Sequence, residues 1–239
     1  MVVNNAYLSD GTGKNLLING NKNINQRAYA GGVLANNVFG YDRWFGSDSD
    51  LNISQVIEQA NISTGTHVLS WVGGGTATVN GVGGIVSGVP FTITVASNIK
   101  VTVPKASTKI QLTRGSVATE MEYRSKTEEL ALCLYYFEQI TTTVANQGIA
   151  SGVATSGTTA SVLLTYAPKR AVPTITMSAG FLGFDGASNA SSTLSLALAG
   201  IDRATLSITM VATIACRAIL LNGDATVGRT ITINAELLS

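Results

Sequence analysis

The sequence is poor in the residue types on which most enzymes and most binders of charged ligands depend. Its 239 residues include one histidine, two cysteines and four prolines, and only 12% of them are charged. The formal net charge is +1, so the chain has no basic field to recruit nucleic acid, and it carries no acidic tail. We therefore expect no nucleic-acid partner.

Long uninterrupted apolar runs are also missing, although the mean hydropathy is high at +0.28. The uncharged stretch 71–99 is broken by glycines, Asn80 and Pro90, which excludes an apolar membrane helix there. The first residues contain no charged segment that leads into an apolar run, so we expect no secretory signal and no membrane partner. Low charge with high apolar content instead indicates subunit interfaces that are buried in a closed oligomer.

Patterns for catalysis and metal binding are scarce. The one histidine, His67, begins an apolar strand without a G-x-S-x-G elbow elsewhere, and we interpret it as exposed or satisfied by hydrogen bonds. One histidine and two distant cysteines, Cys133 and Cys216, make a poor metal site. We expect two free buried thiols, no cofactor and no enzyme activity.

The abundant residues are glycine, threonine, serine, alanine and valine, a composition typical of β-sheets joined by tight turns. Apolar side chains alternate with polar ones along many short stretches, which predicts strands with one buried face. Asn80-Gly81 is a favoured pair for a two-residue hairpin turn. The stretches expected to be strands are 67–72, 76–79, 91–95, 99–103, 110–112, 164–166, 175–177, 206–210 and 231–237.

One helix is predicted, from about residue 126 to 140, after a half-buried strand over 115–124. Ser125 and Glu128 have the spacing of a capping box, in which each side chain satisfies a backbone N–H group of the other residue. The apolar residues that share one face of this helix are Leu130, Cys133, Leu134 and Phe137.

Side chains suited to sugar binding occur at two places. Sugars stack on flat aromatic faces and form hydrogen bonds with Asp, Asn and Arg side chains. Tyr41, Asp42, Arg43 and Trp44 supply such groups from one loop, and Trp71 supplies a further ring. The alternative is structural: Trp71 packs in the core, and Arg43 pairs with Asp42 or with a nearby carbonyl.

Four segments, in order along the chain, resemble a pattern that recurs in bacteriophage tail fibres and related virion appendage proteins. They are NLLINGN at 15–21 with INQR at 24–27, YDRW at 41–44, GSVATEMEYR at 115–124 with EELALCLYYF at 128–137, and YAPKRAVPTIT at 166–176 with NAEL at 234–237. Together these segments frame nearly the whole chain.

The resemblance implies an all-β fold in which a jelly-roll-like β-sandwich is joined by one α-helix to a C-terminal β-sandwich domain. We expect an N-terminal arm or strand segment in 1–27, a shortened jelly-roll-like sandwich in 28–124, a connecting helix in 125–140 and a C-terminal β domain in 141–239. The resemblance also implies a virion structural protein that is assembled in the host cytoplasm, forms a homotrimer, and contacts other virion proteins and a host cell-surface polysaccharide. A head fibre, collar or capsid decoration protein with a purely structural role is the alternative.

Overall fold

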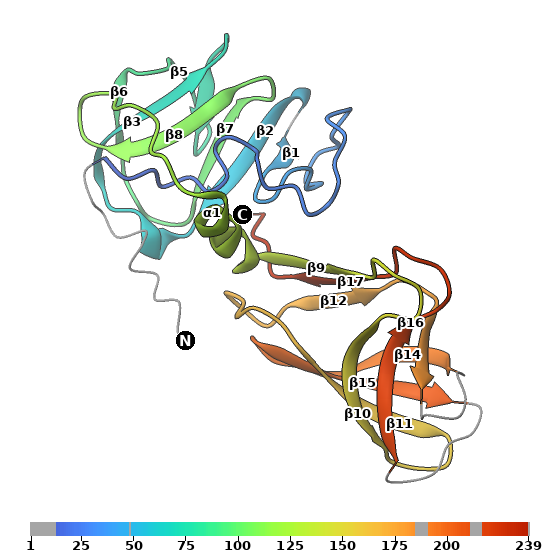
Figure 1. Cartoon of the computed structure of the whole chain (residues 1–239). Helices are drawn as coiled ribbons and strands as arrows, with labels where there is room; N and C mark the ends of the chain where they lie inside the picture. The colour runs from blue at the N-terminus through green and yellow to red at the C-terminus, as the bar shows by residue number, and fades with distance from the viewer. Residues whose placement is uncertain (1–12, 48, 185–190, 211–216, 239) are drawn as a thin grey trace. The chain divides into compact units, whose positions relative to one another are not determined.

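The chain divides into two compact units, each built mainly of antiparallel strands (Figure 1). Unit 1 contains residues 1–133 and 236–239, and unit 2 contains residues 134–235. The computed structural model describes residues 13–47, 49–184, 191–210 and 217–238. The all-β fold that the sequence predicts is therefore confirmed.

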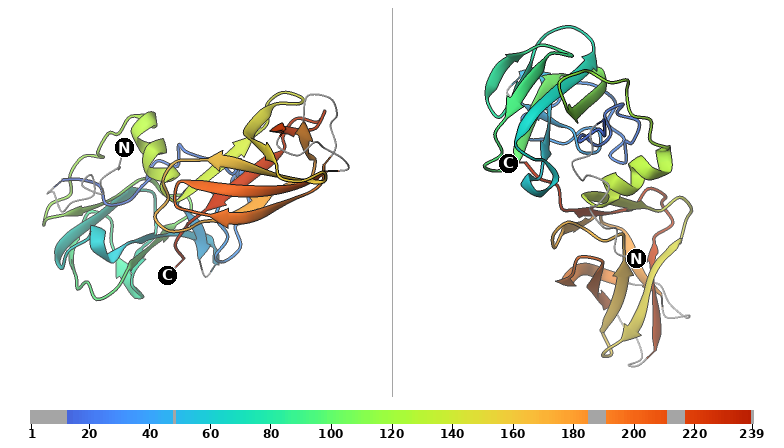
Figure 2. Two further views of the ribbon diagram at one scale, coloured as in Figure 1. Left: turned by 90° about the horizontal axis from the view of Figure 1, so that it is seen from below. Right: turned by 90° about the vertical axis from the view of Figure 1, so that its left-hand side faces the viewer.

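Unit 1 contains two sheets, with strand orders β1-β2-β7-β4-β5 and β6-β3-β8. Its elements are β1 (Phe45–Ser47), β2 (Ser49–Ile57), the 3₁₀ turn η2 (Gln59–Asn61), β3 (Gly65–Val72), β4 (Ala77–Val79), β5 (Val82–Ile85), β6 (Pro90–Ile93), β7 (Ile99–Pro104) and β8 (Thr108–Arg114). Figure 2 shows these strands in two further views. Buried side chains from both sheets form one core, among them Ile53, Leu69, Ile99 and Leu112.

Residues 15–20 complete the second sheet by running along the free edge of β8. Leu16 N donates to Leu112 O at 2.8 Å, and Ile110 N donates to Gly20 O at 3.1 Å. A Cβ atom on Gly20 would lie 2.1 Å from Ile110 O, so only glycine allows this approach. With this segment, β2-β7-β4-β5 faces β6-β3-β8 in the strand order of a jelly roll, and all eight strand positions are filled.

The predicted hairpin turn is confirmed between β4 and β5. Asn80 and Gly81 have φ values of 48° and 80°, the left-handed conformation that a type I′ turn needs at both central residues. Val79 and Val82 are paired on either side of the turn.

The predicted helix exists and begins where the sequence places it. α1 (Lys126–Leu134) is the one α-helix among the residues that the structure describes. Its capping box is confirmed, because Ser125 N donates to Glu128 Oε2 at 2.8 Å and Glu128 N donates to Ser125 Oγ at 3.2 Å. Cys133 is buried on the predicted face.

The predicted end of the helix at residue 140 is wrong, because β9 (Phe137–Thr141) begins three residues after α1 ends. Backbone carbonyls at the helix end are taken by long-range donors: Lys169 Nζ donates to Leu134 O at 2.7 Å, and Ala235 N donates to Tyr136 O at 2.8 Å. Pairing of β9 with a distant strand therefore overrides the local helical pattern. The strand expected over 115–124 is also absent, since β8 ends at Arg114.

Unit 2 is a sandwich of a six-stranded sheet, β13-β16-β10-β11-β15-β14, and a three-stranded sheet, β12-β17-β9. Its remaining strands are β10 (Gly148–Ala154), β11 (Thr159–Thr165), β12 (Thr174–Met177), β13 (Phe181–Phe184), β14 (Ser191–Ala199), β15 (Arg203–Met210), β16 (Ala218–Gly223) and β17 (Thr230–Asn234). Alternate residues of each sheet fill the core, including Val162, Leu206 and Ile208 opposite Ile175, Ile231 and Ile233. The C-terminal β-sandwich is thus present as expected.

Candidate functional site

The loop that carries the first four predicted sugar contacts faces inward. Asp42, Arg43 and Trp44 have 0%, 1% and 0% of their surface exposed, and only Tyr41 remains half-buried. Trp44 Nε1 donates to Asn19 O at 2.9 Å, so the indole holds a neighbouring loop. The prediction that Asp42, Arg43 and Trp44 contact a sugar is corrected, because their polar groups bind within unit 1.

A buried ion cluster explains why two of these side chains are charged. The Asp42 carboxylate accepts from Gln26 Nε2 at 2.6 Å and pairs with Arg27 at 3.2 Å. Burial raises the pKa of Asp42, although these partners partly oppose the shift. Arg43 and Arg27 both pair with Glu236, so the cluster ties the last residues of the chain to unit 1.

Trp71, the fifth predicted contact, packs in the core of unit 1 with 6% of its surface exposed. Ser87 Oγ bonds with both the N–H and the carbonyl of Trp71, each at 2.9 Å, which fixes the strand at this point. The structural alternative for Trp71 is therefore the correct one. Tyr41 is also held by protein, since its ring meets Tyr29 edge to face at a centroid distance of 5.1 Å.

The one histidine offers no open catalytic position. His67 is fully buried on β3, and its Nδ1 lies 3.0 Å from Gly65 O. Among the described residues, no group of three or more His, Cys, Asp or Glu side chains has an arrangement that would hold a metal ion. Cys133 is buried with its pKa raised well above the ordinary value by burial, whereas Cys216 lies outside the described residues.

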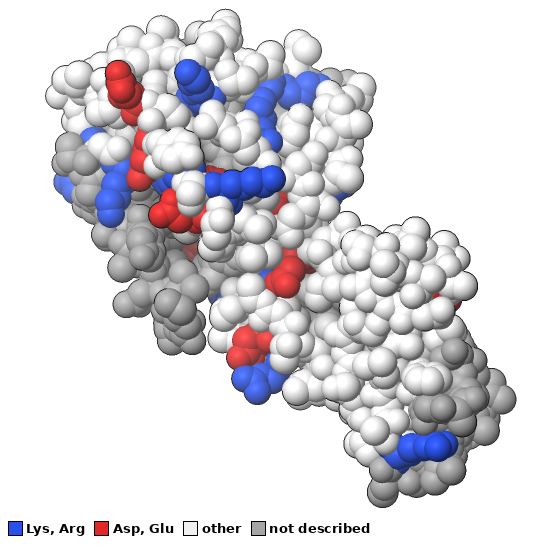
Figure 3. Space-filling view, viewed as in Figure 1, with Lys and Arg blue, Asp and Glu red and all other residues white. Residues whose placement is uncertain are grey.

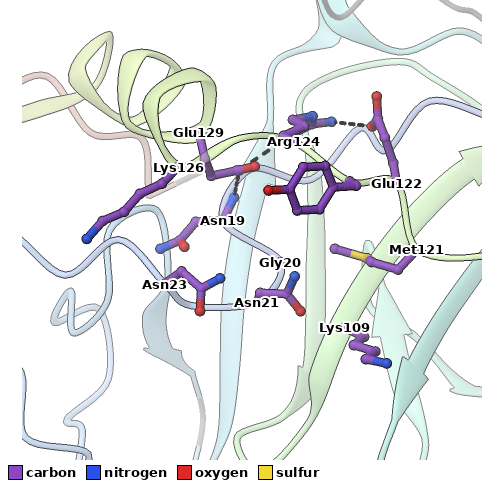
Figure 4. A pocket seen from close by; sticks show the side chains of 11 residues that line it. Asn19, Gly20, Asn21, Asn23, Lys109, Met121, Glu122, Arg124, Lys126 and Glu129 are labelled. Carbon is purple, nitrogen blue, oxygen red and sulfur yellow. Dashed lines mark hydrogen bonds and ion pairs between the residues drawn. The ribbon is translucent and has the colours of Figure 1, made fainter.

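A polar groove of about 550 Å³ opens on unit 1 at a different place (Figure 4). It is lined by residues of the loop 19–23, by Lys109 on β8 and by residues of the segment 121–129. Apart from Asn23, Lys109 and Lys126, the lining residues belong to the first and third segments that resemble the appendage pattern. The fold brings these two segments together from about a hundred residues apart along the chain.

Asn19 shapes one wall of the groove with a fully used amide. Its Nδ2 donates to Ile24 O at 2.8 Å and to Asp42 O at 3.0 Å, while its Oδ1 accepts from Ile24 N at 3.0 Å. The backbone of Asn19 has a φ of 57°, a conformation that asparagine tolerates better than most residues. Asn19 therefore positions the loop and has no amide group left for a ligand.

Arg124 links the segment 121–129, which forms the second wall of the groove, to the wall formed by the loop 19–23 (Figure 4). Its guanidinium pairs with Glu122 at 2.8 Å and with Glu129 at 3.5 Å, and it donates to the carbonyls of Leu17 and Asn15. Glu129 in turn accepts a hydrogen bond from Asn19 N. Both acidic side chains of the groove are thus engaged by protein donors.

The groups left open to a ligand are two amides, two ammonium groups and one phenol ring. Asn21, Asn23, Lys109 and Lys126 are exposed, and Tyr123 is 90% exposed. In Figure 4, Asn21 and Asn23 lie between Lys126 on one side and Lys109 on the other. A second hollow of about 310 Å³ is also lined by Tyr123, which therefore borders both depressions.

None of these five residues is among the sugar contacts that the sequence predicts. Asn21 and Tyr123 lie inside segments that resemble the appendage pattern, and no local pattern marks either residue as a ligand contact. The available signal was that the first and third segments are both rich in polar residues next to a turn. The fold was needed to show that these turns meet.

Comparison of the chain with protein-family models, with curated proteins and with solved structures found no match. Within the described ranges, no helix has both the length and the apolar character needed to cross a membrane.

Proposed function

We propose that this chain is a structural protein of a bacteriophage virion, a tail-fibre-like appendage that attaches the particle to a glycan on the host surface. The observation that carries the proposal is the polar groove with Tyr123 at its border. Sugar-binding sites combine an accessible aromatic face with amide and charged hydrogen-bonding groups, and the groove offers this combination. The order of the four appendage-like segments supports the same class of protein.

Self-association is the second part of the proposal, and it rests on the outer face of the six-stranded sheet of unit 2. One row of paired residues crosses all six strands on this face. It runs Phe184, Leu220, Ser151, Leu163, Thr205, Leu198. Leu163, Leu198 and Leu220 are 48%, 69% and 39% exposed, which is unusual for three leucines that share one row of a sheet.

A second copy of this chain is the partner that fits this face. Within the six strands the only charged residue is Arg203, the first residue of β15. On the face drawn in Figure 3, charged side chains are likewise sparse on unit 2 and gather on unit 1. A partner with a charged surface would bury charges without counter-charges, whereas a copy of the same sheet would not. We propose a homotrimer whose subunits associate through this sheet.

The attachment function is tested by adsorption competition. Free protein added to host cells should block adsorption of the phage, and the Tyr123→Ala variant should lose most of this effect while keeping the wild-type unfolding temperature. Glu120→Ala, which changes an exposed residue outside the groove lining, is the matched control. Equal inhibition by wild type and Tyr123→Ala would contradict attachment through the groove.

A head fibre, collar or capsid decoration protein is the second candidate function, favoured by the uncharged sheet, because assembly through that face needs no sugar site. Imaging of intact virions with a gold-tagged antibody against the chain separates the two. Label at the tail tip supports attachment. Label on the head or collar, with unchanged adsorption and incomplete particles when the protein is missing, supports decoration.

The self-association is tested by light scattering coupled to size-exclusion chromatography. Wild type should elute as a trimer, and Leu163→Asp should shift the mass toward that of the monomer. Val172→Asp is the control, since Val172 is 62% exposed but lies outside the six strands. A monomeric wild type would refute the trimer.

A further inference from the structure

We propose that the polar groove of unit 1 binds an acidic polysaccharide, whose carboxylate or phosphate groups pair with Lys109 and Lys126 on either side of a sugar held by Asn21, Asn23 and Tyr123. This inference rests on the proposed glycan-binding function and names the class of glycan. Its starting point is the state of each charged group around the groove.

The acidic groups around the groove are already neutralised or bonded by protein donors. Glu122 Oε2 accepts from Arg124 at 2.8 Å and from Asn15 N at 2.7 Å. Glu129 is shared between Arg124 and Asn19 N. Arg124 therefore balances one of these two negative charges, and the backbone N–H donors hold both carboxylates at the wall of the groove.

The lysines of the groove, by contrast, are free to bind. In the described part of the chain, neither the Lys109 nor the Lys126 side chain makes a hydrogen bond or an ion pair, and both residues are exposed. Lys14, on the border of the adjoining hollow, is in the same state. By comparison, Lys22 and Lys105 at nearby positions each donate to a backbone carbonyl.

The positions of the two free lysines along the groove favour an acidic sugar over a neutral one. Lys126 and Lys109 lie at its two sides with the two asparagines between them (Figure 4). The groove lining carries three cationic and two anionic groups, a net charge of +1. Arg124 with Glu122 and Glu129 has a net charge of −1, and the unpaired Lys109 and Lys126 together carry +2. A sugar chain with acid groups on successive units would place an anion at each lysine and hydroxyl groups at the amides.

The experiment is an array of uronate-bearing and phosphate-bearing bacterial polysaccharides, each printed beside its carboxyl-reduced or dephosphorylated form. The full chain should bind acidic members and lose at least about tenfold in affinity for their neutralised forms, equivalent to 1.4 kcal/mol or more. The double variant Lys109→Gln/Lys126→Gln should lose a similar factor on the acidic polymers, and binding should weaken as NaCl is raised. Lys100→Gln, a lysine of β7 outside the groove lining, should bind as wild type does.

The outcomes separate this inference from the proposed function. Binding to acidic and neutralised forms with equal affinity, or no loss in the double lysine variant, overturns the acidic class while sugar binding stands. Absence of binding to every acidic polymer overturns it as well. A third outcome is that binding requires both the acid groups and the two lysines, but free protein does not impair phage adsorption. This result would support the acidic-polysaccharide inference and contradict the proposed role in attachment. The uronate and phosphate arms show which acid group is recognised.

Discussion

Removal of the Glu236 carboxylate should strongly destabilise unit 1. Glu236 is the shared counter-ion of Arg43 and Arg27, and the side chains of Glu236 and Arg43 are only 2% and 1% exposed. The variant Glu236→Ala leaves the Arg43 guanidinium buried without this counter-ion, while its hydrogen bond to the neutral Val56 O at 2.7 Å remains. Breaking a buried pair in this way costs about 3–5 kcal/mol.

The two tryptophans make the measurement specific to unit 1. Trp44 and Trp71 are the only tryptophans in the sequence, and both are buried in unit 1. Urea unfolding followed by their fluorescence should show a midpoint lower by about 1.5–2.5 M, for a slope of about 2 kcal/mol per molar urea. Wild type and variants are compared at one protein concentration, because association raises the apparent stability.

Two comparison variants make this reasoning refutable. Glu120→Ala removes an exposed carboxylate of the same unit and should shift the midpoint by less than about 0.3 M, within the range of surface charges. The double variant Arg43→Met/Glu236→Met removes both charges and should be less destabilised than Glu236→Ala alone. A Glu236→Ala midpoint equal to that of Glu120→Ala would show that the cluster does not anchor the end of the chain.

Three further substitutions test the strand packing of unit 2 and the helix cap. Gly152→Ala would place a Cβ atom 1.9 Å from Ser161 O between β10 and β11, so calorimetry should show that the free energy of unfolding falls by about 3 kcal/mol. Gly200→Ala is the control, because its Cβ atom would lie at an ordinary 3.4 Å from the nearest atom and should be tolerated. Ser125→Ala should cost about 1 kcal/mol in the tryptophan assay. The hydrogen bond from the Ser125 backbone N–H lowers the pKa of Glu128, so the ionised carboxylate stabilises the fold above pH 4.5. This stabilisation should disappear as the pH falls through the lowered pKa of Glu128. The Glu128→Gln variant should not show this pH dependence.

Local patterns predicted most of the strands and the start of the helix, because alternation, turn pairs and capping boxes act over a few residues. The hairpin at Asn80-Gly81 and the cap at Ser125 are confirmed for this reason. The end of α1 was not predictable, since the donors that replace helical hydrogen bonds come from Lys169 and Ala235, far along the chain.

The same limit explains the error at the predicted sugar site. The composition of the loop 41–44 suits a ligand, but its residues are satisfied by long-range partners such as Asn19 and Glu236. Tyr123, by contrast, occurs in a segment whose pattern does not indicate a ligand contact, and it becomes notable only because it borders two hollows. Burial is decided by contacts between distant residues, so it was the property that the sequence could not provide.

The structure shows where the few charges of the sequence lie, and their distribution fits the two proposed functions. The six-stranded sheet of unit 2 contains one charged residue, Arg203, at the start of a strand, while free lysines remain around the groove of unit 1. Association between copies is favoured by surface that loses no hydration of charge, whereas capture of an acidic polymer needs charge that stays in water until the ligand arrives. The two requirements are incompatible on one surface. The proposed self-association and the proposed polysaccharide binding therefore use surfaces on different units.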